Sequence, residues 1–284
     1  MRARIKQRLK ELAIDFAALT RSSEPQLRVL LFHHLPQSTL PDFELLISAL
    51  TQHFQFISAA TFEKILRREE RLQRHSLLLT FDDGFRSQFE AAEKVLEPRG
   101  ITALFFIPTA FLDCRSTEAA RAYVASRLCA GRISPSEVAA DLTPMSWEQL
   151  RILNSRGHAA GSHTVNHPAI GALSSDLLLL ELQNSKSRLS AELECDIKHF
   201  AYPFGNSASV NSSALKKALE SYPFVHTGLR GDNRQHGSPA ALIWRESLAP
   251  DCGAKFGVAT ALGALDWWYA LDRRRLLRWV EHRS

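Results

Sequence analysis

Two adjacent carboxylates, those of Asp82 and Asp83, stand at the end of an apolar run in the sequence SLLLTFDDGFR. Residues 77–80 are apolar or β-branched, which is typical of a strand that is buried on both faces of a parallel sheet. Two acids side by side at the end of such a strand repel each other and lose hydration. A bound cation would offset this cost, so we predict that one carboxylate binds a metal and the other transfers a proton. The alternative is a helix N-cap beside a second, solvated acid.

Two histidines, His163 and His167, lie four residues apart in the sequence GSHTVNHP, directly after a short predicted strand. Side chains at this spacing can reach one metal ion from a compact loop. An aspartate from elsewhere in the chain would complete a set of two histidines and one carboxylate, with open positions for water and substrate. The same spacing also occurs by chance, so the histidines alone do not decide between a metal site and a structural loop.

A third candidate, the sequence AYPFGN at 201–206, also follows a predicted strand. Pro203 makes the backbone rigid and Gly205 gives it freedom to turn, so a backbone N–H could be offered to a developing oxyanion. An ordinary turn is the alternative interpretation of the same residues.

Short apolar segments alternate with helical patterns along the chain, which predicts parallel βαβ units. The predicted strands are marked by Val29, Leu77, Ala103, Ala159, Phe200, Phe224 and Leu242. A chain of 284 residues with about seven parallel strands favours a (β/α) barrel, distorted or incomplete, with flanking terminal helices. An open doubly wound sheet is less favoured, because no GxGxxG or GxxxxGK[ST] sequence occurs. In a barrel, all three motifs would meet at the face that hosts catalysis.

The composition sets weaker limits on function. The formal net charge of +5 is mildly basic, which suits anionic lipid, glycan or nucleic acid but is also ordinary for enzymes with neutral substrates. We expect no nucleic-acid partner, and nothing indicates the oligomeric state. The four cysteines are far apart without CxxC spacing, so we predict reduced structural thiols rather than disulfides or a zinc knuckle.

Taken together, the motifs TFDDG, HTVNHP and AYPFG resemble those of the polysaccharide deacetylase (NodB-type) family, carbohydrate esterase family four. The sequence VLLFHHL is similar to the opening strand of such domains. The sequence PMSWEQLRILNSRGHAAGSHTVNHP is similar to the stretch that leads into the family's histidine motif. The resemblance covers roughly residues 28–250 and implies a catalytic domain.

The resemblance assigns roles to individual residues. It implies that Asp83, His163 and His167 bind a divalent metal, usually zinc, and that Asp82 is the general base that takes a proton from the attacking water. A metal lowers the pKa of such a water toward neutrality, in agreement with this division. The backbone N–H of Tyr202 would help to hold the tetrahedral intermediate.

The chain also departs from the family pattern. Many members place an arginine before the proline turn, where it orients the base, but this chain has HFAY there. Arg245 is the best replacement, with a surface or core-rim arginine as the alternative. The family's late histidine, a general acid for the leaving amine, has no clear counterpart. His226 fits best and His236 is a looser option. One of the adjacent histidines His33 and His34 is expected to line the floor of the site, with His33 preferred.

The two ends of the chain are basic and rich in helical patterns. We therefore divide the chain into an amphipathic helix at 1–24, the catalytic domain at 25–254 and a helical extension at 255–284. In the extension, Trp267, Trp268 and Tyr269 precede Arg273–Arg275, as in a helix that lies in a membrane interface. A helix packed on the barrel with a solvated basic end is the alternative.

These observations predict a metal-dependent hydrolase that removes an acyl group, most simply N-acetyl, from an amino sugar of a glycan or glycan precursor, which a lipid could carry. A hydrolase of another non-peptide C–N bond in a small molecule, and a catalytically inactive glycan-binding protein, are the alternatives. The N-terminus has neither an apolar h-region nor a small-residue cleavage site. We expect a cytoplasmic protein, either free or peripherally attached to the inner membrane face.

Overall fold

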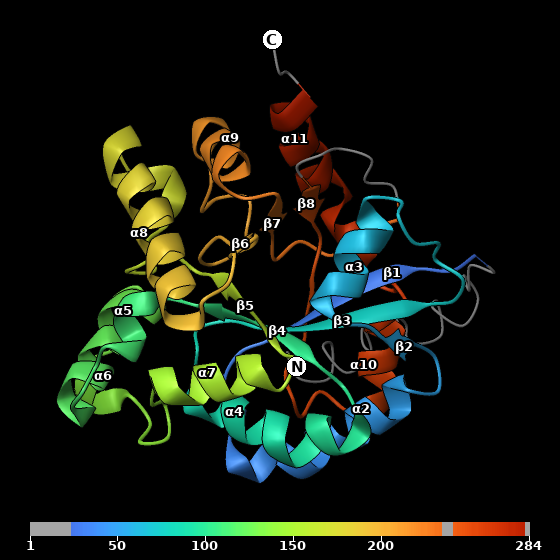
Figure 1. Cartoon of the computed structure of the whole chain (residues 1–284), viewed down its shortest axis with the longest axis horizontal. Helices are drawn as coiled ribbons and strands as arrows, with labels where there is room; N and C mark the ends of the chain where they lie inside the picture. Colours follow the sequence, from blue (N-terminus) through green and yellow to red (C-terminus); the bar gives the residue numbers. More distant parts are fainter. Residues whose placement is uncertain (1–23, 235–240, 282–284) are drawn as a thin grey trace, which may run out of the picture.

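The computed structural model describes residues 24–234 and 241–281 and places parallel strands in the centre of the molecule with helices around them (Figure 1). The strands form one nine-stranded sheet in the order β8-β7-β6-β5-β4-β3-β1-β9, with β2 pairing β3 off this path. Every strand pair is parallel. The strands are β1 (Leu27–Phe32), β2 (Gln55–Phe56), β3 (Ser76–Phe81), β4 (Ala103–Ile107), β5 (Ala159–Ser162), β6 (His199–Ala201), β7 (Phe224–His226), β8 (Ala241–Ile243) and β9 (Glu246–Ser247).

The two ends of this strand path are neighbours in the chain. Strand β8 pairs with β7 and β9 pairs with β1, while only Trp244 and Arg245 separate β8 from β9. The interrupted strand 241–247 therefore connects the two edges of the sheet and closes the barrel. Counted as one position, β8 and β9 reduce the eight strands of the path to seven, so the prediction of a distorted (β/α) barrel is confirmed.

Helices cover the outside of the sheet, and several of them begin with a side-chain cap. Ser146 and Gln149 form a capping box at α7, and the side chains of Ser174 and Asn211 cap α8 and α9. The outer helices are α2 (Leu40–Leu50), α4 (Arg86–Ala91), α5 (Thr109–Leu112), α6 (Thr117–Tyr123), α7 (Trp147–Ser155), α8 (Ser175–Leu193), α9 (Ser212–Ser221), α10 (Ala254–Ala261) and α11 (Ala270–Glu281).

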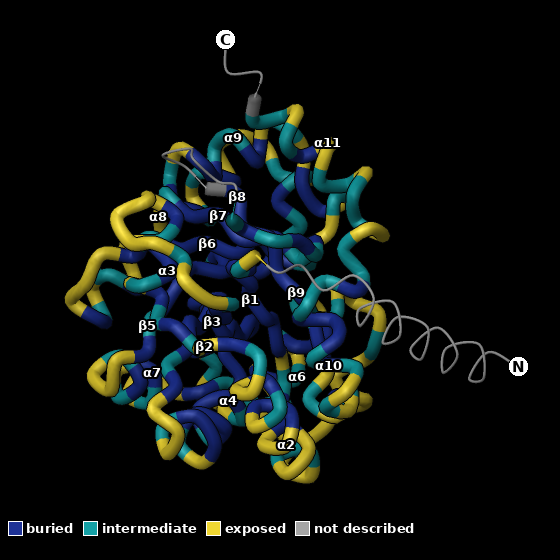
Figure 2. The backbone as a smooth tube through the Cα atoms, turned by 90° about the vertical axis from the view of Figure 1, so that its right-hand side faces the viewer, coloured by how far each residue is buried: buried dark blue, intermediate teal, exposed yellow. Residues whose placement is uncertain are grey.

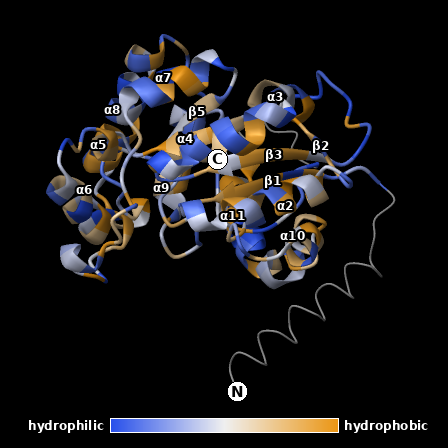
Figure 3. Cartoon of the chain, turned by 90° about the horizontal axis from the view of Figure 1, so that it is seen from below, coloured by the Kyte–Doolittle hydropathy of each residue, from blue (hydrophilic) through white to orange (hydrophobic). Residues whose placement is uncertain are grey.

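Alternate residues of each strand enter two different cores. Leu30, Phe32 and Phe81 face the outer helices, whereas Val29 and Leu78 face the barrel interior. Helix α3 (Ala59–Leu66) inserts Phe62 and Leu66 into this interior and so packs against the inside of the barrel. Figure 2 shows the strands as the most buried part of the chain, and Figure 3 shows the hydrophobic residues concentrated along β1 and β3.

The two terminal segments differ in what can be described. The predicted helix at 1–24 falls almost wholly outside the described residues. In the C-terminal segment, α10 packs against α2, and α11 packs against α9 (Figure 1). Among the described residues, no helix is both long enough and apolar enough to cross a membrane.

Candidate active site

The ends of β1, β3 and β5 bring the first two motifs together. Phe32 pairs with Phe81, so the next residues on each strand, His33 and Asp82, are neighbours across the sheet. The Asp82 N–H donates to the Phe32 carbonyl oxygen at 2.9 Å, which extends the ladder by one residue. His163 directly follows β5, and its N–H donates to the Ile107 carbonyl oxygen at 3.0 Å.

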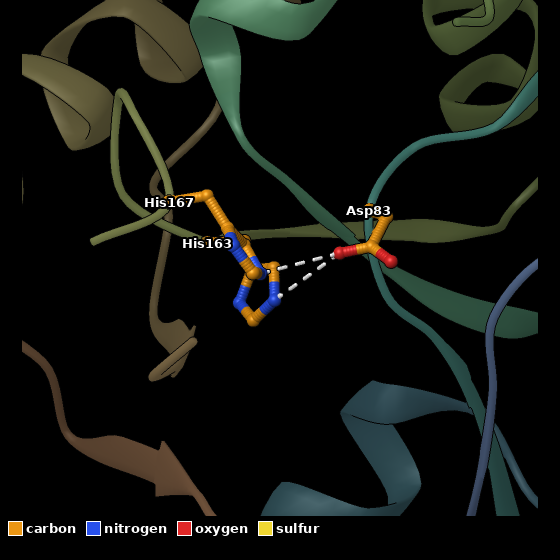
Figure 4. Close-up of side chains that lie close together, drawn as sticks. All are labelled: Asp83, His163 and His167. Atoms are coloured by element: carbon orange, nitrogen blue, oxygen red, sulfur yellow. Dashed lines mark ion pairs between the residues drawn. The ribbon is translucent and has the colours of Figure 1, made fainter. Parts of the chain in front are cut away.

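Asp83, His163 and His167 form a buried group whose ligand atoms all lie within 4.8 Å of one another (Figure 4). Asp83 Oδ1 lies 3.7 Å from His163 Nε2 and 3.4 Å from His167 Nε2. In the sequence Asp83 lies 80 positions before His163 and 84 before His167, in a different motif, and the structure brings the three residues together.

The other ring nitrogen of each histidine faces a backbone carbonyl, and this fixes the tautomer. His163 Nδ1 lies 2.6 Å from the Ala201 oxygen and His167 Nδ1 lies 3.3 Å from the Arg127 oxygen. A carbonyl oxygen only accepts hydrogen bonds, so each Nδ1 carries a proton. Burial, followed by the neighbouring His163, lowers the pKa of His167 to about 4, so its ring is neutral near pH 7.

A neutral imidazole with its proton on Nδ1 presents only a lone pair at Nε2. Two imidazole Nε2 atoms and a carboxylate oxygen converge here, an arrangement that a cation would stabilise. A set of two imidazoles and one carboxylate suits zinc and related divalent metals. The three side chains can hold a metal ion, and their hydrogen bonds to the backbone orient them for it.

Both segments that carry the candidate metal ligands, the turn after β3 and the loop after β5, have an uncommon backbone conformation. Asp83, Thr164 and His167 have positive φ angles of 77°, 69° and 57°, which non-glycine residues rarely adopt. Glu181 on α8 fixes the loop, because its carboxylate accepts hydrogen bonds from the N–H groups of Val165 and Asn166 at 2.7 and 2.9 Å. The sequence motifs did not single out Glu181, since it lies on a different element.

Arg245 and Asp82 form a bidentate ion pair inside the barrel mouth. The guanidinium donates from Nη1 and Nη2 to the two carboxylate oxygens at 2.7 and 2.8 Å, and both side chains are buried. Arg245 also donates from Nε to the Thr227 oxygen at 2.7 Å, which holds the side chain from its stem. The structure therefore places Arg245 where the sequence predicted an arginine that orients the base.

This pairing keeps Asp82 ionised despite its burial. Burial by itself raises the pKa of the carboxyl group, but Arg245 and then His163 oppose it, and the pKa lies below its usual range. His33 contributes in the same direction, which agrees with its position beside Asp82 on the neighbouring strand. A charged, firmly oriented carboxylate stands next to the candidate metal ligands.

The two adjacent histidines at the end of β1 have different surroundings. His33 is exposed at the barrel mouth. His34 is tied to other residues: its Nδ1 lies 2.9 Å from Ser87 Oγ and its Nε2 lies 3.0 Å from Asp141 Oδ2. Of the two, His33 is the one whose side chain is accessible beside Asp82.

A single buried amide connects the ends of β1 and β3. Gln88 on α4 is fully buried, and its Nε2 donates to the carbonyl oxygens of both His33, at 3.2 Å, and Asp82. No spacing rule singles out this glutamine in the sequence. In the structure it holds together the two backbone positions that carry the exposed histidine and the ionised carboxylate.

His226 does not occupy the place that the sequence predicted for a proton donor. It is fully buried on β7, its Nε2 lies 2.9 Å from His199 Nδ1, and its ring lies 4.7 Å from that of Phe106. A substrate amine cannot reach a ring with no exposed surface in this conformation. The other option, His236, lies outside the described residues, which leaves His33 as the histidine best placed for this role.

Tyr202 was predicted to offer its backbone N–H, but that group already donates to the His226 oxygen at 3.4 Å. Its hydroxyl donates to the Gly205 oxygen at 2.9 Å, and the residue is fully buried. Two residues further on, the Phe204 N–H has no hydrogen-bond acceptor among the described residues. Phe204 has a φ of 65°, is partly exposed, and its ring lies 4.8 Å from that of His167. Phe204 is thus the better placed donor.

The (β/α) barrel, with two histidines and two aspartates at its strand ends, can be compared with solved structures, and several of them share its fold. A Streptococcus pyogenes deacetylase, PplD, in complex with acetate has a TM-score of 0.64 at 19% identity, covering 84% of this chain and 99% of that chain. IcaB from Ammonifex degensii has a TM-score of 0.60 at 23% identity, covering 84% and 97%. A de-N-acetylase from Aggregatibacter actinomycetemcomitans has a TM-score of 0.62 at 16% identity, covering 84% and 99%.

The sequence itself identifies the family. The family model described as polysaccharide deacetylase matches residues 69–223, a stretch that includes both aspartates, both metal-site histidines and the AYPFG turn. No curated protein matches the chain. The chain belongs to the polysaccharide deacetylase family, and membership supports deacetylation of a carbohydrate.

Proposed function

We propose that this protein is a metal-dependent N-deacetylase that hydrolyses the N-acetyl group of an amino sugar in a glycan or glycan precursor. One observation carries the proposal: the ionised Asp82, paired with Arg245, stands beside three converging acceptor atoms of Asp83, His163 and His167. A general base next to a cation site is what hydrolysis of an amide by water requires.

Asp83, His163 and His167 would hold the metal, for which zinc suits the donor set. When bound, the metal supplies a Lewis acid that acidifies water and polarises the acyl carbonyl. Asp82 accepts the proton of the attacking water. Arg245 is a positioning residue, because its bidentate contact keeps both carboxylate oxygens in one plane and one orientation.

Two further groups complete the reaction. As the water oxygen bonds to the acyl carbon, the carbonyl oxygen gains negative charge, and we assign the Phe204 N–H, which has no acceptor among the described residues, as a donor to it. The C–N bond then breaks as its nitrogen receives a proton, and we assign His33 as the donor of that proton. The products are acetate and a free amino sugar, and the proton taken up by Asp82 balances the one given by His33 after exchange with solvent.

The choice of the N-acetyl group and the amino sugar comes from the family and the neighbours. One structural neighbour is described as a de-N-acetylase and another was solved with acetate bound. A small-molecule amide remains the rival substrate class. An inactive glycan-binding protein is less favoured, because the base, its arginine and all three candidate ligands are present together.

The test is acetate release from N-acetylated hexosamine oligomers, measured together with the metal content of the purified protein. We expect the metal-loaded wild type to release acetate, and Asp82→Asn to lose roughly a hundred- to ten-thousandfold in rate while keeping its metal. Asp251→Asn, a change of an exposed aspartate, is the matched control. Metal-loaded protein that releases no acetate from any such sugar but cleaves small amides would favour the rival. Protein that binds no stoichiometric divalent metal would refute the proposal.

A further inference from the structure

Three large apolar side chains near the C-terminal end are more than half exposed. Trp267 and Trp268 in the 3₁₀ turn η7 (Asp266–Tyr269) are 63% and 65% exposed, and Leu271 at the start of α11 is 77% exposed. Tryptophan is the residue that proteins favour at the boundary between water and hydrocarbon, because its ring is apolar and its N–H is polar. Side by side, these three residues form an unusual surface for a protein in water.

Arginines continue this surface along one side of α11. Leu271, Arg274, Arg275 and Arg278 are spaced by three and four residues and therefore share one helix face. All four are exposed, whereas Leu276 on the other side of the helix is fully buried. Together with Asp272 and Leu277, they line a hollow of about 670 Å³. We call Trp267, Trp268, Leu271, Arg274, Arg275 and Arg278 the C-terminal patch.

The arginines of the patch have no carboxylate partner among the described side chains. Among the side chains that the structure describes, no carboxylate pairs with Arg274, Arg275 or Arg278, although Arg275 lies over the Trp279 ring at 4.9 Å. The nearby acids are otherwise engaged: Asp266 accepts from Arg28 at 2.7 Å, and Asp272 accepts from Ser207 at 2.7 Å. Three exposed guanidinium groups suit phosphate oxygens, which they bind with paired N–H donors.

The patch is also connected to the active-site loop. The contact between Asp272 and Ser207 joins the first turn of α11 to the segment that begins with Phe204, the proposed oxyanion donor. Arg273 joins α11 to the segment that follows β7, because it donates to the backbone oxygen of Arg230, and it also donates to the backbone oxygen of Asp266 in η7. Whatever binds the patch would therefore lie close to one rim of the barrel mouth.

We propose that the C-terminal patch binds the surface of a lipid bilayer that contains anionic phospholipids. The tryptophans and Leu271 enter the interface between headgroups and acyl chains, and the three arginines bind headgroup phosphates. Attachment is peripheral, in line with the absence of a spanning helix from the described residues. The proposal does not rest on the proposed reaction, but it would place the barrel mouth where a lipid-linked glycan is carried.

The test is flotation of the full chain with vesicles of phosphatidylcholine, alone or with part of it replaced by phosphatidylglycerol. We expect binding only to the anionic vesicles, weakened by added salt. Replacement of Arg274, Arg275 and Arg278 by Gln should lower the partition coefficient roughly a hundredfold at low salt, since each basic residue near such a surface contributes about a factor of ten or less. Trp267→Ala with Trp268→Ala should lower it roughly tenfold.

The matched control carries the same loss of charge at another exposed surface: Lys64→Gln, Arg71→Gln and Arg74→Gln together. It should float like the wild type. Equal losses in control and patch variants would show that only the overall positive charge matters and would overturn the proposal. Unchanged flotation of the patch variants would also overturn the proposal. This includes the case where removal of residues 1–23 abolishes flotation. If the wild type self-associates but does not float, and the patch variants no longer self-associate, then the patch binds a second copy of the chain. That result would also overturn the proposal.

Discussion

Two pairs of buried histidines lie in the same barrel and have opposite chemical characters. His163 and His167, at the strand ends, each give one ring nitrogen to a backbone carbonyl and direct the other toward Asp83. His199 and His226, inside the barrel, instead contact each other at 2.9 Å, and His199 Nε2 lies 3.3 Å from Glu63 on α3. Burial does not distinguish a ligand from a structural histidine; the direction of its free nitrogen does.

Burial lowers the pKa of a histidine in each pair, His167 at the metal site and both His199 and His226 inside the barrel. It lowers the pKa of His167 to about 4, and it lowers the pKa of His226 well below the usual value, with His199 and Arg245 adding to the effect. Neutrality gives His167 the lone pair that a metal needs. For His226, neutrality lowers the stability of the folded state as the pH falls, because the unfolded chain binds a proton at this residue and the folded chain does not.

The largest expected difference between the pairs is in metal binding. His163→Ala should lose stoichiometric metal and at least a thousandfold in activity, because the cation site loses one of three ligands. His226→Phe, which keeps an aromatic ring in the interior, should keep its metal. Elemental analysis of both purified variants measures this. Loss of metal from the His226 variant alone would reverse the comparison.

The next effect concerns the proton donor, where His33 replaces His226 as the proposed residue. His33→Gln should lower the rate of amide cleavage roughly a hundredfold, because the amine leaves poorly without a proton. The same variant should cleave an activated acetate ester, whose leaving group needs no proton, at nearly the wild-type rate. His34→Gln is the control from the same strand end. An equal loss on amide and ester would remove His33 from this role.

Gln88 should show a smaller effect, as a positioning residue rather than a catalytic one. Gln88→Leu has nearly the same volume but loses the donors that hold the backbone of His33 and Asp82. We expect about a tenfold loss of kcat with unchanged metal content and a loss of roughly 1–2 kcal/mol in the free energy of unfolding. A pH–rate profile distinguishes a positioning role from a purely structural one. Displacement of Asp82 from Arg245 raises the pKa of Asp82, so the acidic limb of the profile shifts to higher pH. An unshifted profile with a lower melting temperature would leave Gln88 a purely structural role.

The smallest effect is the pH dependence of stability. The pKa of His226 is lowered on folding, so its contribution is complete above the unfolded value near 6.5 and stability falls as the pH decreases below it. One excluded proton gives a slope of at most about 1.4 kcal/mol per pH unit. Between pH 6.5 and 5, the free energy of unfolding of His226→Phe should depend on pH less steeply than that of the wild type, by up to this amount. Denaturant titrations at several pH values measure this difference. Parallel slopes would mean that His226 is protonated in the folded protein.

Short stretches of sequence were enough to predict much of the barrel and the candidate metal site. Apolar runs such as LLLT and LFFI predicted buried parallel strands, and the seven strand markers all fall in observed strands. The two aspartates and the HxxxH pair were then placed at strand ends, and parallel strands bring such ends to one face. Local spacing is sufficient here because each motif contains its own strand, its turn and its functional residue.

The partners of these residues lie far apart in the chain and could not be predicted in the same way. Asp82 meets Arg245 across 163 positions, because the interrupted strand β8–β9 returns to close the barrel beside β1 and β3. The choice of His33 over His226 depends on depth and face. His33 follows the last paired residue of β1 and is exposed, whereas His226 is itself a paired residue of β7 inside the barrel.

The sequence by itself determined the chemistry available to this protein: two acids, two histidines and a flexible turn, each at the end of a strand. Only the tertiary structure decided which groups share a site, since a shift of one residue along a strand turns a side chain to the opposite face. The Tyr202 N–H is already bonded to the His226 oxygen on the neighbouring strand, whereas the Phe204 N–H, in the turn that follows, has no acceptor among the described residues. A contact between residues 65 positions apart, Ser207 and Asp272, places α11 next to this turn, and no local sequence pattern predicts it.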